Sequence, residues 1–432
     1  MFGILMRKMP EGSRIKSASS RHKRRNHFAN DRPPAMLEVA LTGIVAGGKA
    51  MGRAPDGRVV FVSYAIPGEQ VVAEVTETHT QYFEARTVRV LRPSSFRVKP
   101  RCQYFGRCGG CQLQHVEYDE QLRIKTQIVR DQLIRVGRFS DDHELTFPPA
   151  IGMEMPWNYR NHMRFTVWRK GQVGLMQQGT HQLLRVDQCD IACDQINQAL
   201  GMVQDATTGT KQLVMRVGQN TGDVLIHPRL AWRDNATNPS LESGQKIVRE
   251  TLLGRRYQIS VAAFFQVNTI QAERLLGYVI DKVNEVSPRV VVDAYAGVGV
   301  FASHLAAHVS EVFAIEESPS AATDAGVNLM GLSNVEWMIA RVEDVLPRRD
   351  FSPDVVIVDP PRRGLPPEVL GSLVASPAYR IIYVSCDPAT LARDLRRLVN
   401  CGFKLTEVQL LDMFPHTQHI ECVAIVDRVF TL

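Results

Sequence analysis

Two polar residues follow short apolar runs near the end of the chain, Asp359 within Asp354–Gly364 and Cys386 within Arg380–Leu395. Each run of Val and Ile breaks at a polar turn, which is typical of strands buried on both faces of a parallel sheet. Ligands of open α/β sheets bind outside the carboxyl ends of the strands, so we expect both side chains to face one crevice. Because a helix is expected directly after Cys386, its N-terminus is expected to stabilise a thiolate there. The sequence therefore predicts a nucleophilic cysteine beside a carboxylate.

The residues before these runs predict the first half of the same sheet. Residues 289–306 have the pattern of a strand, a Gly-x-Gly turn at 297–299 and a helix. Glu316 ends the next apolar run nineteen residues after the first of these glycines, the offset at which an acid binds a ribose hydroxyl. Two apolar runs within 404–432 predict a closing hairpin, a feature of class I methyltransferases that dehydrogenases lack. These patterns favour a nucleotide-binding α/β domain of the methyltransferase type.

The eight cysteines of the chain are unevenly distributed. Cys102, Cys108 and Cys111 have the spacing C-x5-C-x2-C, and Cys189 or Cys193 can supply a fourth ligand. In a chain without a secretion signal, clustered cysteines indicate a metal centre and not disulfides. Four thiolates suit a [4Fe–4S] cluster and equally suit structural zinc. The spacing alone leaves these two centres open.

Alternating apolar and polar residues predict sheets in two other parts of the chain. Residues 36–91 alternate between turns of Gly, Pro and Asp, which predicts about five short antiparallel strands in a small β-barrel of OB type. Such barrels bind single-stranded nucleic acid, and a structural or dimerising role is the alternative. Residues 156–185 interleave basic and aromatic side chains, which favours an RNA-binding face. Residues 116–138 have the spacing of one amphipathic helix, and Phe264 and Phe265 are expected in the core.

The net charge of +6 has a local origin. Residues 1–35 contain nine Lys and Arg against Glu11 and Asp31, which gives this segment a net charge of +7. With little to pack a core, the segment is expected to be a disordered basic arm. It is either a nucleic-acid-binding tail or the product of an over-long choice of start codon, with true initiation near Met36. No apolar run is long enough to span a membrane and no signal peptide is evident, so we expect a cytoplasmic monomer.

These motifs resemble one family closely, the bacterial S-adenosylmethionine-dependent RNA uracil-C5 methyltransferases of the 23S rRNA branch. The similarity runs from about Met36 to the end and is carried by CQYFGRCGGC, FFQVN, DAYAGVGVF, DPPRRG, VSCDPATLARDL and MFPHTQHIE. It implies an α/β protein with four parts: the disordered arm (1–35), a TRAM barrel of OB type (36–95), a central α+β iron–sulfur and RNA-binding domain (96–250) and a Rossmann-like class I methyltransferase domain (251–432). It also implies that the helix at 116–138 packs on the catalytic domain.

The resemblance implies a role for each candidate site residue. Cys386 corresponds to the nucleophile that adds to C6 of uracil, and Glu421 to the base that removes the C5 proton. The implied contacts to S-adenosylmethionine are Gln266, Tyr295, Glu316 and Asp359. The implied ligands of a structural [4Fe–4S] cluster are Cys102, Cys108, Cys111 and Cys189. The target base must leave its stack to reach Cys386, as in other enzymes that modify bases.

Three alternative functions remain at the level of sequence. The substrate is expected to be 23S rRNA because of the cysteine cluster, with tRNA as the alternative. An enzyme that methylates an exocyclic amine also uses an Asp-Pro-Pro motif, but it needs no covalent cysteine. A non-enzymatic RNA-binding protein is the third alternative, and the presence of Cys386, Asp359 and Glu421 argues against it.

Overall fold

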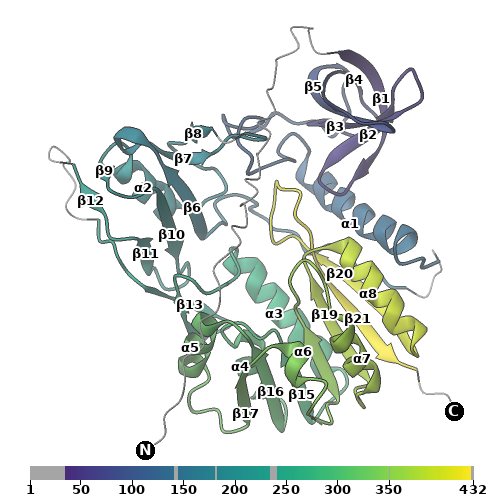
Figure 1. Ribbon diagram of the computed structural model, residues 1–432, viewed down its shortest axis with the longest axis vertical. Coiled ribbons are helices and arrows are strands. Elements are labelled where there is room, and N and C mark those ends of the chain that lie inside the picture. Colours follow the sequence, from purple (N-terminus) through teal and green to yellow (C-terminus); the bar gives the residue numbers. More distant parts are fainter. Residues whose placement is uncertain (1–34, 141–144, 181, 234–240, 350, 430–432) are drawn as a thin grey trace, which may run out of the picture. The chain divides into compact units, whose positions relative to one another are not determined.

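The computed structural model describes residues 35–140, 145–180, 182–233, 241–349 and 351–429 (Figure 1). The predicted basic arm lies outside these residues, apart from Ala35. The first five strands are β1 (Met36–Val45), β2 (Lys49–Arg53), β3 (Val59–Ser63), β4 (Gln70–Thr78) and β5 (Tyr82–Arg92). They close a barrel in the order β1-β2-β3-β5-β4. The predicted five-stranded barrel is confirmed.

One strand pair in the barrel differs from the expected antiparallel pattern. β3 and β5 run parallel, with Val59 opposite Tyr82. β4 pairs with β1, so β5 lies between β4 and β3 and closes the barrel. Because β5 is antiparallel to β4, it runs in the same direction as β3. Alternate residues such as Val60 and Val62 fill the barrel interior and are fully buried.

A five-stranded sheet follows, in the order β11-β10-β6-β7-β8. Its elements are β6 (His162–Val167), a 3₁₀ turn (Arg169–Gly171), β7 (Val173–Met176), β8 (Leu183–Arg185), α2 (Asp194–Val203), β10 (Gln212–Val217) and β11 (Val224–His227). Two small ladders accompany it, β9 (Thr207–Thr208) with β12 (Ala231–Trp232) and β13 (Ile247–Leu252) with β14 (Arg255–Ser260). Buried residues of α2 and of this sheet share one apolar core.

The last part of the chain forms a seven-stranded sheet in the order β17-β16-β15-β18-β19-β21-β20. Its strands are β15 (Val290–Ala294), β16 (Glu311–Glu316), β17 (Val335–Ile339), β18 (Val355–Val358), β19 (Arg380–Ser385), β20 (Phe403–Leu411) and β21 (Glu421–Arg428). Its helices are α3 (Thr269–Asn284), α4 (Val300–Leu305), α5 (Pro319–Asn328), α6 (Val342–Val345), α7 (Pro367–Ala375) and α8 (Pro388–Asn400). The first five strands of this order are parallel and β21 and β20 are antiparallel, as expected for a class I methyltransferase fold.

Helices cover both faces of this sheet, which explains why its central strands are apolar throughout. Every residue of β18 and β19 is buried. One apolar core joins the sheet to α7, α8 and the earlier helix α1 (Tyr118–Arg135), and the other joins it to α3, α4 and α5. None of the helices in the described part of the chain has the length and apolar character needed to cross a bilayer.

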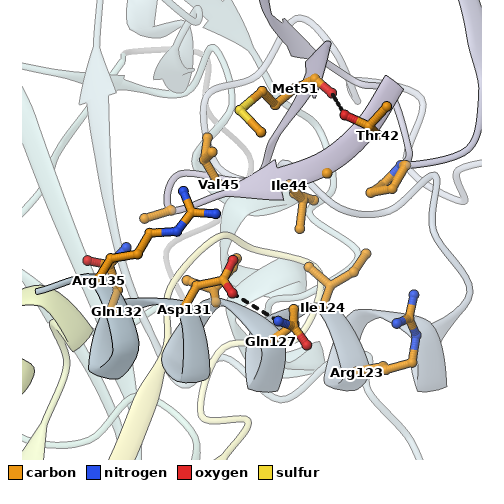
Figure 2. A pocket seen from close by; sticks show the side chains of 14 residues that line it. Thr42, Ile44, Val45, Met51, Arg123, Ile124, Gln127, Asp131, Gln132 and Arg135 are labelled. Atoms are coloured by element: carbon orange, nitrogen blue, oxygen red, sulfur yellow. Dashed lines mark hydrogen bonds between the residues drawn. The ribbon is translucent and has the colours of Figure 1, made fainter. Parts of the chain in front are cut away.

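Helix α1 contacts both the catalytic sheet and the barrel. It packs along α8, and its buried Ile124 and Ile128 share a core with Ile44 of β1. Figure 2 shows Ile44 and Ile124 on facing sides of a cavity of about 420 Å³, with Gln127 donating a hydrogen bond to Asp131 along the rim. The amphipathic pattern therefore serves two apolar neighbours, the barrel and the methyltransferase sheet.

A buried ion pair fixes α1 to the loop that precedes β21. Lys125 Nζ lies 2.6 Å from Asp412 Oδ1, and the two side chains are 1% and 0% exposed. Tyr118 Oη donates to the other carboxylate oxygen of Asp412 at 2.9 Å. Lys125 also donates to the carbonyl oxygen of Phe414 at 3.0 Å. Both charges are thus paired inside the protein.

We predict that Lys125→Met destabilises the protein by about 3–5 kcal/mol, because it leaves the Asp412 carboxylate buried without its cation. Urea denaturation of wild type and variant measures the change in the free energy of unfolding. The matched control is Arg348→Met, which removes an exposed pair with Asp344 and should cost below about 1 kcal/mol. The double variant with Asp412→Leu should recover most of the loss. Equal losses for Lys125→Met and the control would contradict the prediction.

Candidate active site

The register of three neighbouring strands brings together the predicted nucleophile, base and carboxylate. The antiparallel pairing of β19 and β21 ends with Ser385 opposite Cys422. The next position on the β19 side is Cys386, and the next on the β21 side is Glu421. On its other side β19 pairs in parallel with β18, which ends directly before Asp359. All three side chains therefore belong to the same edge of the sheet, where the parallel strands end.

Cys386 occupies the turn between β19 and α8, where it is half-buried. The next residue, Asp387, caps the helix: its Oδ1 accepts hydrogen bonds from the backbone N–H groups of Ala389 and Thr390 at 3.1 and 3.0 Å. Pro388 occupies the first helical position, where no N–H is needed. The turn thus presents the thiol at the start of a well-capped helix.

The environment of Cys386 opposes the thiolate, in contrast to the expectation from the sequence. Burial raises the pKa of Cys386 to about 11, the charges of Glu421 and Asp359 raise it as well, and Arg362 acts in the opposite direction. The helix N-terminus does not offset these effects, because Asp387 already uses its first free amides. The cysteine is therefore held as a thiol next to two carboxyl groups.

Both neighbouring carboxyl groups bind their protons more tightly than usual. Burial raises the pKa of Asp359 to about 7, with a further contribution from Glu316. Burial, followed by the charge of Asp359, raises the pKa of Glu421 well above its ordinary value, and Arg362 acts against this. A carboxyl group with a raised pKa is suited to proton transfer near neutral pH.

Two acids, Glu316 and Asp293, anchor the glycine turn of the sheet and the helix after it. Asp293 was not among the site residues predicted from the sequence. Glu316, at the end of β16, accepts a hydrogen bond from Gly297 N at 3.0 Å. Asp293, in β15, accepts from Ala302 N at 2.9 Å and is 1% exposed. Burial raises the pKa of Asp293 to about 7, and the charges of Asp359 and Glu316 contribute. A buried acid inside an apolar strand was the available signal for Asp293.

Tyr295 and Gln266 lie in irregular segments beside this turn. Tyr295 has a φ of 67°, a left-handed conformation that is uncommon for a residue with a side chain. Its hydroxyl is buried and has no partner within the described residues. Gln266 lies between β14 and α3 and is half-buried, and no side-chain hydrogen bond holds it within the described residues. Both side chains thus have unused hydrogen-bonding groups.

Two expectations about aromatic residues are wrong. Phe265 is buried as expected, but Phe264 is 70% exposed, because the segment before α3 is irregular and its successive side chains point in opposite directions. Conversely, Tyr159 and Phe165 of the basic and aromatic stretch are 2% and 1% exposed and belong to apolar cores. These two rings are not available to stack on RNA bases.

Arg362 and His419 were not singled out as site residues from the sequence. Arg362 Nη2 lies 3.0 Å from Nδ1 of His419 and acts on the pKa of both Cys386 and Glu421. Burial, with the charge of Arg362, lowers the pKa of His419 to about 4, so its imidazole is neutral at pH 7. The first arginine of the DPPRRG motif, directly after the two prolines, was the available signal for a cation at this site.

The four predicted metal ligands line one cavity of about 360 Å³. They are Cys102, Cys108, Cys111 and Cys189, and the same cavity is lined by His419 of the catalytic edge. Cys193 is buried in a neighbouring apolar core and does not line it. Among the described residues, no three His, Cys, Asp or Glu side chains are grouped closely enough to hold a metal ion. The four cysteines thus share one cavity.

Two family profiles match the sequence. The profile described as tRNA (Uracil-5-)-methyltransferase matches residues 236–429, and that of the TRAM domain matches residues 36–88. An uncharacterized RNA methyltransferase of Caldanaerobacter subterraneus subsp. tengcongensis is 35% identical, over 91% of this chain and 98% of that protein. A second, from Thermosynechococcus vestitus, is 33% identical over 90% of this chain and 98% of that protein.

A solved structure has the same fold. It is the tRNA (uracil-54, C5)-methyltransferase of Pyrococcus abyssi in complex with S-adenosyl-L-homocysteine, with a TM-score of 0.69 and 24% sequence identity. The superposition covers 90% of this chain and all of that one. It confirms the predicted methyltransferase fold. Together with the relatives that match over nearly their whole length, these findings show that the chain is an RNA methyltransferase and belongs to the RNA uracil-5-methyltransferase family with an N-terminal TRAM domain.

Proposed function

We propose that this protein transfers a methyl group from S-adenosylmethionine to C5 of a uridine in 23S rRNA, through a covalent adduct between Cys386 and C6 of the uracil. The observation that carries the proposal is the placement of Cys386 and Glu421 at neighbouring positions of paired strands, beside Asp359. Covalent addition activates C5, which is a poor nucleophile in free uracil. The neighbouring carboxyl group then has a proton to remove.

Cys386 Sγ loses its proton to water and bonds to C6, while the electron pair of the C5–C6 double bond moves toward O4. C5 then takes the methyl group as the bond between that methyl carbon and the sulfonium breaks, which leaves S-adenosylhomocysteine. Glu421, in its ionised form, accepts the proton from C5, and the bond between Cys386 and C6 breaks to release 5-methyluridine. Arg362 is the cation that favours both ionised groups, because it lowers the pKa of Cys386 and of Glu421.

The acidic edge of the sheet supports S-adenosylmethionine as the methyl donor. We assign its contacts to Gln266, Tyr295, Glu316 and Asp359. Glu316 ends the second strand of the fold, where an acid is suited to the ribose hydroxyls. The unpartnered hydroxyl of Tyr295 and the free amide of Gln266 supply further polar contacts. The relative from Pyrococcus abyssi, whose fold this chain shares, was solved with S-adenosyl-L-homocysteine.

We propose domain limits that follow the family resemblance. They are 36–95 for the TRAM barrel, 96–250 for a central iron–sulfur and RNA-binding domain, and 251–432 for the methyltransferase domain. The contacts of α1 with α8 and with the loop before β21 support its assignment to the catalytic domain in space.

We further propose that Cys102, Cys108, Cys111 and Cys189 hold a [4Fe–4S] cluster. Their shared cavity supports this set. Four thiolates also suit structural zinc, so the iron and zinc content of the purified protein distinguishes the two centres. When bound, the cluster supplies a covalent cross-link between the loop at 102–111 and Cys189.

The substrate proposal favours 23S rRNA because of these cysteines, and tRNA is the second candidate. The family profile that matches the chain is described by its tRNA substrate, and the named relatives are described only as RNA methyltransferases. Methylation assays on unmodified 23S rRNA and on tRNA distinguish the two substrates.

We predict that Cys386→Ala abolishes 5-methyluridine formation, with a loss of at least about a thousandfold in rate. Unmodified 23S rRNA and tRNA are incubated with methyl-labelled S-adenosylmethionine, and the nucleosides are identified by mass spectrometry. Wild type should give 5-methyluridine in rRNA, whereas product in tRNA alone would replace the substrate and keep the mechanism. A methylated purine that persists in Cys386→Ala would overturn the mechanism. The control, Cys401→Ala, changes an exposed cysteine and should retain full activity.

Glu421→Gln should let the adduct form and block its release. A covalent complex of protein and RNA should therefore accumulate on denaturing gels, while turnover falls by about 10²–10⁴-fold. Removing the Glu421 charge also lowers the pKa of Cys386, so alkylation of Cys386 by iodoacetamide should reach its half-maximal rate at lower pH than in wild type. The control is Glu368→Gln, an exposed acid on α7. Equal adduct levels and alkylation profiles in both variants would contradict the assignment.

Protein purified without oxygen should contain about four iron atoms per chain and show broad visible absorption, because four Cys thiolates hold a [4Fe–4S] cluster. Cys111→Ser should lose both signals and Cys193→Ser should retain them, since Cys193 does not line the cavity. One zinc atom per chain with no visible absorption would refute the cluster.

A further inference from the structure

A second cavity, of about 390 Å³, lies next to the catalytic edge and has no role in the chemistry above. Five parts of the chain line it: the turn between β1 and β2, the end of β3, the cysteine loop at 109–112, the segment that follows β7, and the loop before β21. Its wall includes Gln418, three residues before Glu421 and adjacent to His419. The cavity is therefore within reach of RNA whose target uridine lies at Cys386.

The polar groups of this cavity are mainly side-chain amides. Gln177 and Gln418 are half-buried, and their amides have no hydrogen-bond partner within the described part of the chain. Gln112 differs, because it donates to the Gly109 carbonyl oxygen at 2.8 Å and accepts from Gln418 N at 3.1 Å. Gln112 is thus structural, while Gln177 and Gln418 each present a free donor beside a free acceptor.

The charge of the cavity excludes a phosphate as its main ligand. Among the described residues that line it, Lys49 is the one cationic side chain, and it forms an ion pair with Glu84 at 2.6 Å. The same lining residues include no arginine. The wall is therefore nearly neutral, unlike the arginine-rich surfaces that bind the RNA backbone.

Glycines leave the backbone of this cavity accessible. Gly47 and Gly48 form the turn between β1 and β2 with φ of 95° and 71°, a conformation that a residue with a Cβ adopts only under strain. A Cβ atom at position 47 or 48 would lie 3.7 or 3.5 Å from the side chain of Gln418. Tyr64 adds a ring, and its hydroxyl donates to Gln178. A flat ligand can thus approach the two free amides.

We propose that this cavity binds one adenine base of the RNA substrate, a base flanking the target uridine that is unstacked when the uridine enters the active site. Adenine presents a donor beside an acceptor, N6–H₂ with N7, and a glutamine amide pairs with both. Guanine would call for an arginine and cytosine for a carboxylate, and neither is free among the described residues of the wall. Unstacked bases are what proteins read in folded RNA. The inference deepens the proposed function and rests on its placement of the target at Cys386.

The test is a double-mutant cycle on RNA affinity. The methylated uridine is first located by mass spectrometry, as the position that is methylated in RNA from normal cells and unmethylated in RNA from cells that lack the protein. Short hairpins around it are then made with each flanking adenine replaced by an abasic site. One replacement should weaken binding to wild type by about tenfold. Gln418→Ala and Gln177→Ala should weaken binding of the unaltered hairpin similarly, and the same abasic site should then cost nothing further.

The control variant is Gln132→Ala, a half-buried glutamine of α1 that lines the separate cavity of Figure 2. It should bind as wild type does and retain the full abasic penalty. Additive losses at every position, or a target with no flanking adenine, would overturn the proposal. The identity of the methylated nucleoside is scored separately, so a product other than 5-methyluridine would refute the proposed function while the affinity cycle still decides on the cavity. Thermal melting of each variant excludes misfolding as the cause of a loss.

Discussion

The burial of several carboxyl groups at one edge of a sheet is the constraint on which this site depends. Asp293, Glu316, Asp359 and Glu421 all lie near the edge where the parallel strands end, and three of them have raised pKa values. Each acid makes the ionisation of its neighbours less favourable, since their charges are close together and poorly solvated. A cation bound among them relieves this repulsion. S-Adenosylmethionine carries a sulfonium and an ammonium group beside one carboxylate, and its net charge of +1 suits such a crevice.

Burial also determines how the loop between β20 and β21 (412–420) is held. The loop before β21 begins at the buried Asp412, which is paired with Lys125 of α1. Farther on, His416 stacks on Trp157 with ring centroids 3.7 Å apart, and its backbone N–H donates to Gln121 at 3.0 Å. All three partners come from segments that lie far earlier in the chain than the loop itself. Glu421, the proposed base, thus follows a loop that α1 and the segment of Trp157 hold in place.

The sequence predicted the parts of the site that lie on regular elements. The Val and Ile runs identify β18 and β19, and the polar residues that end them follow at fixed positions, so Asp359 and Cys386 could be placed together. Electrostatic effects could not be predicted in this way. The helix N-terminus beside Cys386 suggested a lowered pKa, whereas burial and two acids from distant segments raise it. Phe264 and Tyr159 were misplaced for the same reason, because exposure depends on tertiary neighbours that local patterns do not specify.

The cysteine loop at 102–111 is connected to the loop between β20 and β21 (412–420) by backbone hydrogen bonds. Cys111 is followed by Gln112 and Leu113, whose N–H groups donate to the carbonyl oxygen of His416 at 3.1 and 2.9 Å. On its other side the loop pairs with the segment after β7, where Cys108 lies opposite Gln177. Cross-linking the four thiolates would fix this loop between the two segments. The proposed cluster would thereby also restrain His416, five residues before Glu421.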